Sequence, residues 1–97
     1  MNITFDKRAR KFLKSLPEED KGRISGHIDL FSVNGFNMTG KYLKKIENNL
    51  WELRPGSIRV FFGLINSDAI IVNIFRKKTQ KTPKQEIETA KRRLKEY

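Results

Sequence analysis

The chain has 97 residues, enough for one domain with a single modest hydrophobic core. It contains no cysteine and one histidine, His27, which excludes disulfides and thiolate zinc sites and argues against a histidine metal site. Lysine and arginine number 21 against 11 acidic residues, and this net charge of +10 favours a polyanionic partner, nucleic acid first. The alternatives are a solvated basic surface or a site for an acidic protein.

The sequence favours the cytoplasm as its location. Residues 1–6 lack the apolar run of a signal peptide, and no stretch approaches the roughly 20 apolar residues of a membrane-spanning helix. We therefore expect a cytoplasmic protein without a membrane partner.

The first third of the chain predicts a short strand and two helices. Residues 2–5 fit the strand, and apolar residues then recur at helical spacing over residues 9–16. Asp6 is suited to cap the first helix. Pro17 ends that helix and begins a second one, which has an acidic first turn and stops at the Asn-Gly pair 34–35.

The middle of the chain changes to the two-residue period of strands. Four strands are predicted, at residues 42–47, 50–54, 58–65 and 69–75, with turns rich in asparagine, glycine and serine between them. Connections this short require antiparallel pairing, because parallel pairing needs long crossovers.

A last helix follows the final strand. Thr82 is suited to cap it, Pro83 to occupy its first position and Gln85 to complete a weak capping box. Residues 1–97 are therefore predicted to form a single α+β domain of order β-α-α-β-β-β-β-α. In this prediction an N-terminal helical hairpin packs on a small antiparallel sheet, and a C-terminal helix ends the chain.

Strand alternation groups several charged side chains at one end of the predicted sheet. In the strand at residues 50–54 the apolar side chains face the core, so Glu52 and Arg54 face outward. Arg59 points away from an apolar strand face, toward the side of Arg54. If the last two strands form a hairpin, Arg76 comes near Arg59 at the same end.

The segment after the last strand adds a dense group of cations. Residues 76–97 hold nine cationic and three anionic side chains, a net charge of +6, and Lys77, Lys78, Lys81 and Lys84 lie near its start. Arginines that converge with lysines in this way are suited to binding phosphates. The alternative is an outer sheet face that is merely soluble.

Conventional catalytic sets are missing from the sequence. We find no Ser/His/Asp or Cys/His arrangement and no phosphate-binding glycine loop, and we expect the lone His27 to be structural or exposed. A hydrolase here would rely on positioning and charge stabilisation, without a metal or other cofactor. RNA suits such a site because its own 2′-hydroxyl is a nucleophile. Glu52 could then be a base or could pair with Arg54 or Arg59, and the ion pair is the commoner arrangement.

Three segments carry a resemblance to a known family. Residues 50–54 (LWELR), 58–62 (IRVFF) and 75–83 (FRKKTQKTP), followed by a basic helix, closely resemble the RelE/HigB branch of the RelE/ParE toxin superfamily. The resemblance covers nearly the whole chain and implies the toxin of a type II toxin–antitoxin module. RelE- and HigB-like members are ribosome-dependent mRNA endonucleases that inhibit translation. The alternatives are a non-enzymatic, ParE-like DNA gyrase inhibitor and a non-toxic RNA-binding module.

The resemblance also implies partners and site residues. The expected partners are a cognate antitoxin, commonly a helix-turn-helix protein, the ribosome and mRNA, with operator DNA bound only through the antitoxin complex. Arg59 matches the arginine at the start of a family strand, which is implicated in stabilising the transition state. Arg76 and Lys77 fall in the basic loop where RelE-like enzymes keep another functional arginine. Arg59, Arg76 and Glu52 are thus the catalytic candidates, and the RNA-binding candidates are Arg54, Lys77, Lys78, Lys81 and Lys84.

This chain departs from the family pattern at two places. Leu50 and Glu52 stand where RelE-like enzymes carry lysines, and residues 85–87 replace a family tyrosine early in the last helix. Tyr97 could substitute only if the C-terminus folds back, and its i+3 relation to Leu94 favours packing instead.

Overall fold

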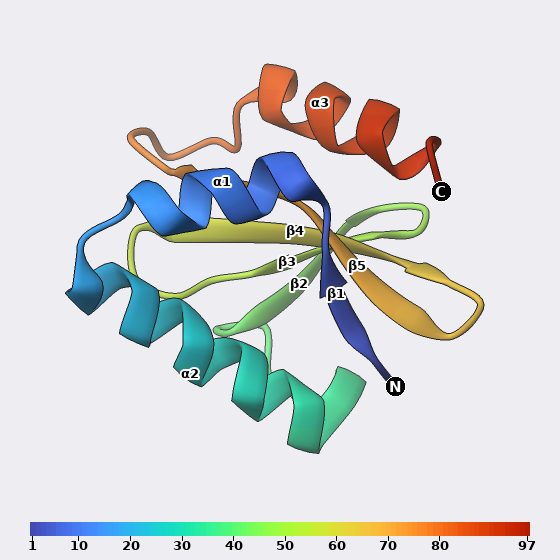
Figure 1. Cartoon of the computed structure of the whole chain (residues 1–97), viewed down its shortest axis with the longest axis horizontal. Coiled ribbons are helices and arrows are strands. Elements are labelled where there is room, and N and C mark those ends of the chain that lie inside the picture. Colours follow the sequence, from blue (N-terminus) through green and yellow to red (C-terminus); the bar gives the residue numbers. More distant parts are fainter.

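A five-stranded sheet with helices on both faces organises the chain, and the computed structural model describes residues 1–97 (Figure 1). The elements in chain order are β1 (Ile3–Phe5), α1 (Lys7–Ser15), α2 (Glu18–Asn34), a 3-10 turn η1 (Gly35–Asn37), β2 (Leu43–Glu47), β3 (Leu50–Leu53), β4 (Ile58–Ile65), β5 (Asp68–Arg76) and α3 (Lys84–Leu94). The predicted α+β class and the predicted order of elements are confirmed. Every helix is too short or too polar to cross a bilayer.

The strand order is β1-β5-β4-β3-β2. Strands β2 to β5 pair antiparallel through short turns, as predicted. The sheet is nevertheless mixed, because β1 pairs parallel with β5 and places Ile3 opposite Ala69. The short-connection argument does not apply to this pair, since two helices and three strands separate β1 from β5 along the chain.

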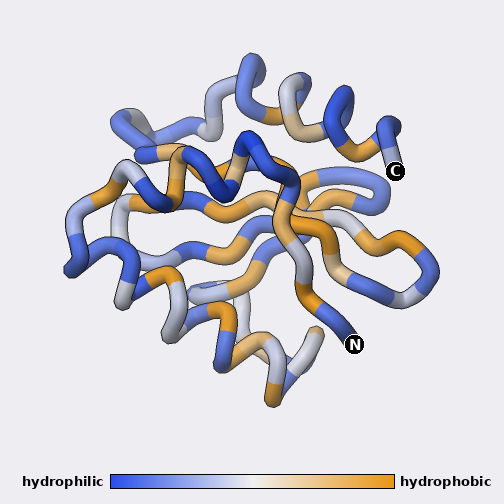
Figure 2. The backbone as a smooth tube through the Cα atoms, viewed as in Figure 1, coloured by the Kyte–Doolittle hydropathy of each residue, from blue (hydrophilic) through white to orange (hydrophobic).

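The first core lies between the sheet and the helical hairpin. Ala9 of α1 and Ile24 and Phe31 of α2 pack against residues of β4 such as Val60 and Phe62, and all five are fully buried. Figure 2 shows hydrophobic colour concentrated in the strands and recurring at intervals along the helices. This core is the one that the apolar periodicity of the helices predicts.

A second core covers the opposite face of the sheet, which we predicted to face outward. Phe61, Val72 and Phe75 pack there with Ala90 of α3. Gly63 lets α3 approach, because a Cβ at this position would lie 2.5 Å from Leu94 Cδ2. The prediction that the side chain of Glu52 faces solvent was therefore wrong: α3 returns over this face, and Glu52 is only 1% exposed.

The N-terminus of α1 is capped as predicted, whereas the N-terminus of α3 is not. Asp6 caps α1, and its carboxylate accepts a 2.8 Å hydrogen bond from the backbone N–H of Arg8. Thr82 does not cap α3, Pro83 holds the cap position instead of the first helical position, and no capping box forms, because the helix begins at Lys84 without a side-chain cap. Its first turn is instead held from β5, where the buried Asn73 donates to the carbonyl of Glu86 at 3.1 Å and to its carboxylate at 3.0 Å.

The C-terminus does fold back, but it meets the start of α1. Tyr97 donates a 2.7 Å hydrogen bond to the carboxylate of Asp6, and Arg8 pairs with both Asp6 and Glu96 at 2.7 Å. The hydrogen bonds from Arg8 hold the pKa of Asp6 well below its usual range, although burial opposes them. We call these four residues the terminal cluster. Tyr97 thus joins the two ends of the chain together.

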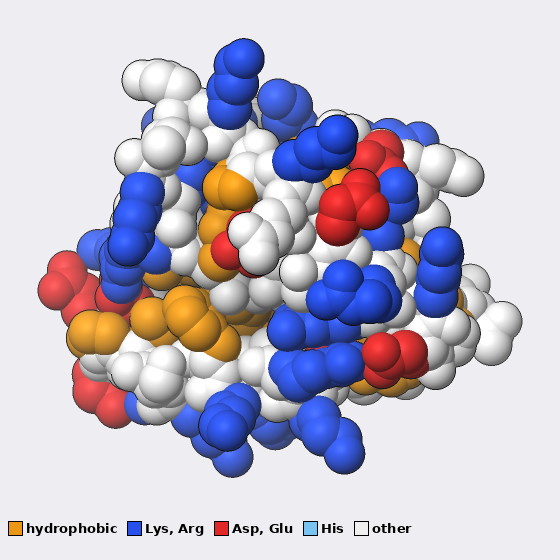
Figure 3. Space-filling view, turned by 90° about the horizontal axis from the view of Figure 1, so that it is seen from above, with side chains coloured by type: hydrophobic (Ala, Val, Ile, Leu, Met, Phe, Trp, Pro, Cys, Tyr) orange, Lys and Arg blue, Asp and Glu red, His pale blue; other side chains and the backbone are white.

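Cations dominate the face that carries α3. Figure 3 views the molecule from this side and shows lysine and arginine side chains spread widely, with acidic side chains in smaller groups among them. The basic residues of α3 and α1 thus extend the positive charge of the molecule beyond the sheet end that we predicted to bind phosphates.

Candidate phosphate-binding site

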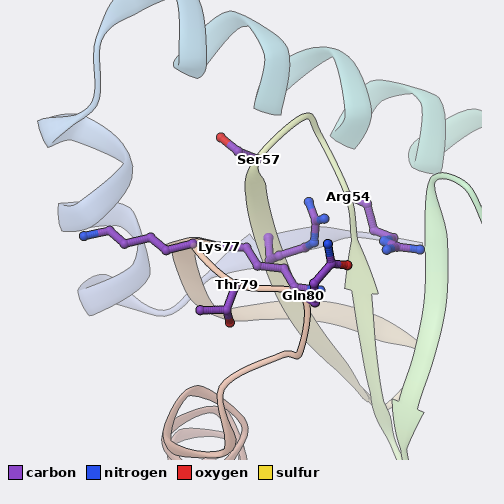
Figure 4. Close-up of a pocket in the computed structure, with 7 residues that line it drawn as sticks. Arg54, Ser57, Lys77, Thr79 and Gln80 are labelled. Carbon is purple, nitrogen blue, oxygen red and sulfur yellow. The ribbon is translucent and has the colours of Figure 1, made fainter.

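A polar hollow lies at the sheet end where β3 stops, β4 starts and β5 leads into the basic loop (Figure 4). Its volume is about 520 Å³, and no hydrophobic or acidic side chain lines it. The lining residues are Arg54, Ser57, Arg59, Lys77, Lys78, Thr79 and Gln80. Four cations around a hollow without a carboxylate in its wall create a site for an anion. We call it the phosphate hollow.

The backbone fixes the two walls of this hollow against each other. Gly56 has a φ of +61°, a left-handed conformation that lets the turn between β3 and β4 reverse tightly. The carbonyl of Ser57 in this turn accepts a 2.7 Å hydrogen bond from the backbone N–H of Lys77. The basic loop therefore starts in contact with the turn that precedes β4.

Arg59 is held firmly but retains hydrogen-bonding capacity. Its Nη1 donates to the carbonyls of Gly56 at 2.7 Å and Ile58 at 2.9 Å, whereas Nη2 has no partner within the protein. Burial lowers the pKa of this guanidinium; Glu52 opposes the shift and Arg54 adds to it. An arginine stays charged under such a shift, so Arg59 offers a fixed cation with free donors.

Glu52 lies behind the phosphate hollow, between two arginines. Its Oε1 is 3.4 Å from Arg54 Nε and 4.0 Å from Arg59 Nε, while its buried Oε2 and both of these Nε atoms lack hydrogen-bond partners. Arg54 also donates to the carbonyl of Gly40 at 3.1 Å. Since Glu52 is buried, this geometry favours the ion-pair alternative over a base that contacts substrate.

Arg76 does not join Arg54 and Arg59. The register is as predicted, with Arg76 opposite Ile58, but its side chain turns to the α2 face of the sheet. There it donates to the carboxylate of Asp20 at 2.7 Å and to the hydroxyl of Ser57 at 3.0 Å. Alternation explains this placement, because a residue opposite the core residue Ile58 shares its face.

The lysines of the basic loop divide into two groups. Lys77 and Lys78 line the phosphate hollow, and Figure 4 shows the side chain of Lys77 extending away from Arg54 and Gln80. Lys81 and Lys84 are exposed and lie outside the lining. Ser57, Thr79 and Gln80 were not among the predicted site residues, although Thr79 and Gln80 lie in the segment 75–83 that carries the family resemblance.

Comparison with known proteins identifies the family. Residues 11–95 match the family described as Phage derived protein Gp49-like (DUF891). The chain belongs to this family. No curated protein matches the sequence.

Solved structures similar to this Gp49-like protein share its fold. RelE in the archaeal RelE–RelB complex of Pyrococcus horikoshii aligns with a TM-score of 0.68 and 20% identity, over 82% of this chain and 97% of that one. The RelB–RelE complex of Methanococcus jannaschii gives 0.63 and 24%, over 75% and 88%. The isolated E. coli RelE toxin gives 0.58 and 16%, over 94% and 96%. The predicted resemblance to RelE-type toxins is therefore confirmed.

A second hollow adjoins the first in this Gp49-like protein. Its volume is about 400 Å³, and it is lined by His27, Lys41, Tyr42, Arg54, Gly56 and Arg59. His27 is half-buried, and its Nδ1 lies 3.1 Å from the carbonyl oxygen of Arg23. We call it the ring hollow. Lys41 and Tyr42 were not predicted as site residues, because an aromatic residue at a strand start is an ordinary feature.

The residues of both hollows are suited to anions and not to cations. No group of three or more histidine, cysteine, aspartate or glutamate side chains gathers anywhere in the chain to hold a metal ion. What the site offers chemically is positive charge and N–H donors in fixed positions, together with two aromatic rings.

Proposed function

We propose that this protein is the toxin of a type II toxin–antitoxin module and that it cleaves mRNA on the ribosome. The likeness to RelE toxins supports a toxin of such a system. The observation that carries the nuclease proposal is the phosphate hollow, in which Arg54, Arg59, Lys77 and Lys78 surround a space with no acidic wall.

The proposed reaction uses the 2′-hydroxyl of the RNA as the nucleophile. Its oxygen forms a bond to the neighbouring phosphorus while the bond to the 5′ oxygen breaks. The 2′-hydroxyl gives up its proton to solvent water, the 5′ oxygen takes one proton from solvent and leaves as a hydroxyl, and a 2′,3′-cyclic phosphate remains. Arg59 stabilises the charge that develops on the phosphoryl oxygens, since its guanidinium is fixed by two carbonyls and Nη2 is free.

The other site residues act around this centre in the proposal. Arg54 and Lys78 bind the phosphate, and Glu52 keeps the two arginines apart and oriented from behind the hollow. Arg76, held by Asp20, acts from the other face of the sheet by fixing the turn and the start of the basic loop. Lys77, Lys81 and Lys84 bind flanking phosphates of the RNA.

The proposal includes specific partners. The Pyrococcus and Methanococcus RelE proteins were solved bound to RelB, the second as an antitoxin–toxin complex, which supports a cognate antitoxin for this chain. That antitoxin is a helix-turn-helix protein, through which alone the complex binds operator DNA. The remaining partners are the ribosome and its mRNA, in the cytoplasm.

In vitro translation of a defined mRNA tests the proposal. Primer extension should reveal new 5′ ends inside codons, dependent on ribosomes, and the upstream fragments should end in 2′,3′-cyclic phosphate. Arg59→Ala should reduce the cuts by about 10²–10³-fold, whereas Arg92→Ala, which removes the same charge from an exposed position on α3, should keep them.

Three results would contradict parts of this proposal. Fragments with 5′-phosphate and 3′-hydroxyl ends would exclude attack by the 2′-hydroxyl. Intact mRNA with stalled translation would mean that the protein blocks the ribosome without cutting. Intact mRNA with normal translation would exclude the ribosome as target, and a DNA gyrase supercoiling assay would then test the ParE-like alternative.

A further inference from the structure

We propose that the ring hollow is a nucleobase subsite, which receives one base of the RNA whose phosphate occupies the phosphate hollow. The inference rests on the proposed binding of RNA, and it adds a ligand class for a hollow that the proposed cleavage does not use. The residues that would contact the base are Tyr42, His27 and Gly56.

The two hollows share a wall, so a single ligand can span both. Arg54 and Arg59 line both of them. The turn between β3 and β4 also serves both, because Gly56 faces the ring hollow and Ser57 the phosphate hollow. A ligand bound across this wall must carry an anionic group next to a group that fits the second space, as a nucleotide does.

The second space offers ring surfaces where the first offers none. The rings of Tyr42 and His27 meet edge to face, with centroids 5.6 Å apart and planes inclined by 61°. Tyr42 is 36% exposed. The His27 ring beside it is held in place by its own contact with the carbonyl of Arg23. Nucleic-acid bases stack on such exposed rings, and every base can do so because each has a π face.

Gly56 adds no side chain of its own to the wall of this hollow. The Arg23 side chain packs against it, with Cδ 3.2 Å from where a Cβ would stand, so the surface for a flat ligand comes from the rings of Tyr42 and His27. A second phosphate suits this hollow less well. The one cation that it adds to the shared arginines is Lys41, whose ammonium lies 5.5 Å from the centre of the Tyr42 ring.

Binding of nuclease-resistant RNA tests this subsite in the isolated protein. The probe is a labelled single-stranded hexanucleotide with 2′-O-methyl groups, and six further versions each lack one base. Binding of each is measured by fluorescence anisotropy at low salt. At one position the loss of the base should weaken binding to the unaltered protein by about 5- to 150-fold, the range expected for one stacked base.

Substitutions at Tyr42 should trace that loss to the ring. Tyr42→Ala should bind the complete hexanucleotide as weakly as the unaltered protein binds the version without that base, and should show no further loss with that version. Tyr42→Phe should bind like the unaltered protein. The slope of log affinity against log salt should stay unchanged in Tyr42→Ala and should fall by about 0.7 in Arg54→Ala, because only the arginine neutralises a phosphate.

The outcomes separate this subsite from the proposed cleavage. Equal affinity for the complete and all six base-free hexanucleotides, or a loss in Tyr42→Ala that is the same for every version, would overturn the subsite while ribosomal cleavage could still be found. Failure of the unaltered protein to bind any hexanucleotide would overturn it as well. A positional loss that disappears in Tyr42→Ala supports the subsite even if ribosomes show no cleavage, in which case the proposed function alone falls. The circular dichroism of Tyr42→Ala should match the unaltered protein, since the ring is exposed.

Discussion

Two clusters of arginine and carboxylate show how differently the same chemistry can be arranged in one small molecule. In the terminal cluster Asp6 accepts four hydrogen bonds of 2.7–3.0 Å, three from Arg8 and one from Tyr97. At the phosphate hollow Glu52 approaches Arg54 and Arg59 only to 3.4 and 4.0 Å, and polar atoms of all three side chains lack partners.

This difference distinguishes a cluster that holds the fold from one that retains capacity for a ligand. Donors and acceptors that are satisfied inside the protein contribute to stability, because burial without a partner is unfavourable. Unpartnered buried groups are uncommon in folded proteins and call for a physical reason. An anion in the phosphate hollow would accept from the free Nη2 of Arg59, whereas the buried Nε atoms of both arginines lie beside Glu52 behind the hollow. Single substitutions in the terminal cluster should therefore change stability, whereas substitution of Arg59 at the phosphate hollow should change function.

The largest effect is expected from removing one arginine of each cluster, Arg59 at the phosphate hollow and Arg8 in the terminal cluster, in separate variants. Arg59→Ala should lower the rate of ribosomal mRNA cleavage by about 10²–10³-fold, because a fixed donor to the developing charge is lost. Arg8→Ala should leave the cleavage rate unchanged and lower the midpoint of urea unfolding, since Arg8 joins both ends of the chain. Single-turnover cleavage and urea titrations of both variants check the pair of expectations. Loss of cleavage in Arg8→Ala at full folding would show that the terminal cluster also serves function.

Glu52→Gln should have the next largest effect. The substitution keeps the side-chain shape and leaves two partly buried arginines without a counter-charge, so we expect a loss of about 2–3 kcal/mol in the free energy of unfolding. This value lies below the usual cost of breaking a buried pair, because Arg54 is 29% exposed. Glu88→Gln, at an exposed position on α3, is the matched control and should change the free energy of unfolding by less than about 0.5 kcal/mol. Urea unfolding measures both, and equal values for the two variants would exclude a structural role for Glu52.

The contrast between the clusters also explains which parts of the molecule the sequence could predict. The strands and the first two helices carry local signals, and alternation alone brings Glu52, Arg54 and Arg59 to one face. The same rule, carried from Ile58 to its partner Arg76, would have put Arg76 on the opposite face, but the prediction considered only closeness along the strand.

Other features depend on contacts between distant segments and had no local signal. The covering of the second sheet face depends on α3 meeting Phe61 and Phe75 around Gly63. The apolar stripe of α3 can be read from the sequence, but the sheet face that it covers cannot. The ring hollow needs α2 to bring His27 against Tyr42. Both are tertiary contacts, which a pattern along the chain cannot give.

Acid should weaken the terminal cluster through Asp6. Its pKa is lower in the folded than in the unfolded chain, so the unfolded chain takes up the proton first as the pH falls. The stabilisation is therefore complete above the ordinary aspartate pKa of about 3.9 and is lost as the pH falls through that value toward the folded pKa. Asp6→Asn keeps a capping oxygen. Its free energy of unfolding should be about 1–2 kcal/mol lower than that of the unaltered protein at pH 7, and the two values should converge near pH 2.

Urea unfolding at pH 7, 4 and 2 measures this convergence. Asp29→Asn, at an exposed position on α2 that forms no ion pair, is the matched control and should run parallel to the unaltered protein. Asp6 would be excluded as the origin of the acid sensitivity if the difference in unfolding free energy between Asp6→Asn and the unaltered protein stayed constant from pH 7 to pH 2.

The smallest effect should come from Tyr97→Phe, which isolates one hydrogen bond of the terminal cluster. The ring remains, and Asp6 keeps its three bonds from Arg8, so the loss in unfolding free energy should be about 1 kcal/mol. Cleavage and hexanucleotide binding should not change, because Tyr97 lines neither hollow. This result would separate Tyr97 from the family tyrosine that the last helix lacks. If Tyr97→Phe instead lowered the cleavage rate while hexanucleotide binding stayed unchanged, the C-terminal residue would have to leave Asp6 and reach the substrate.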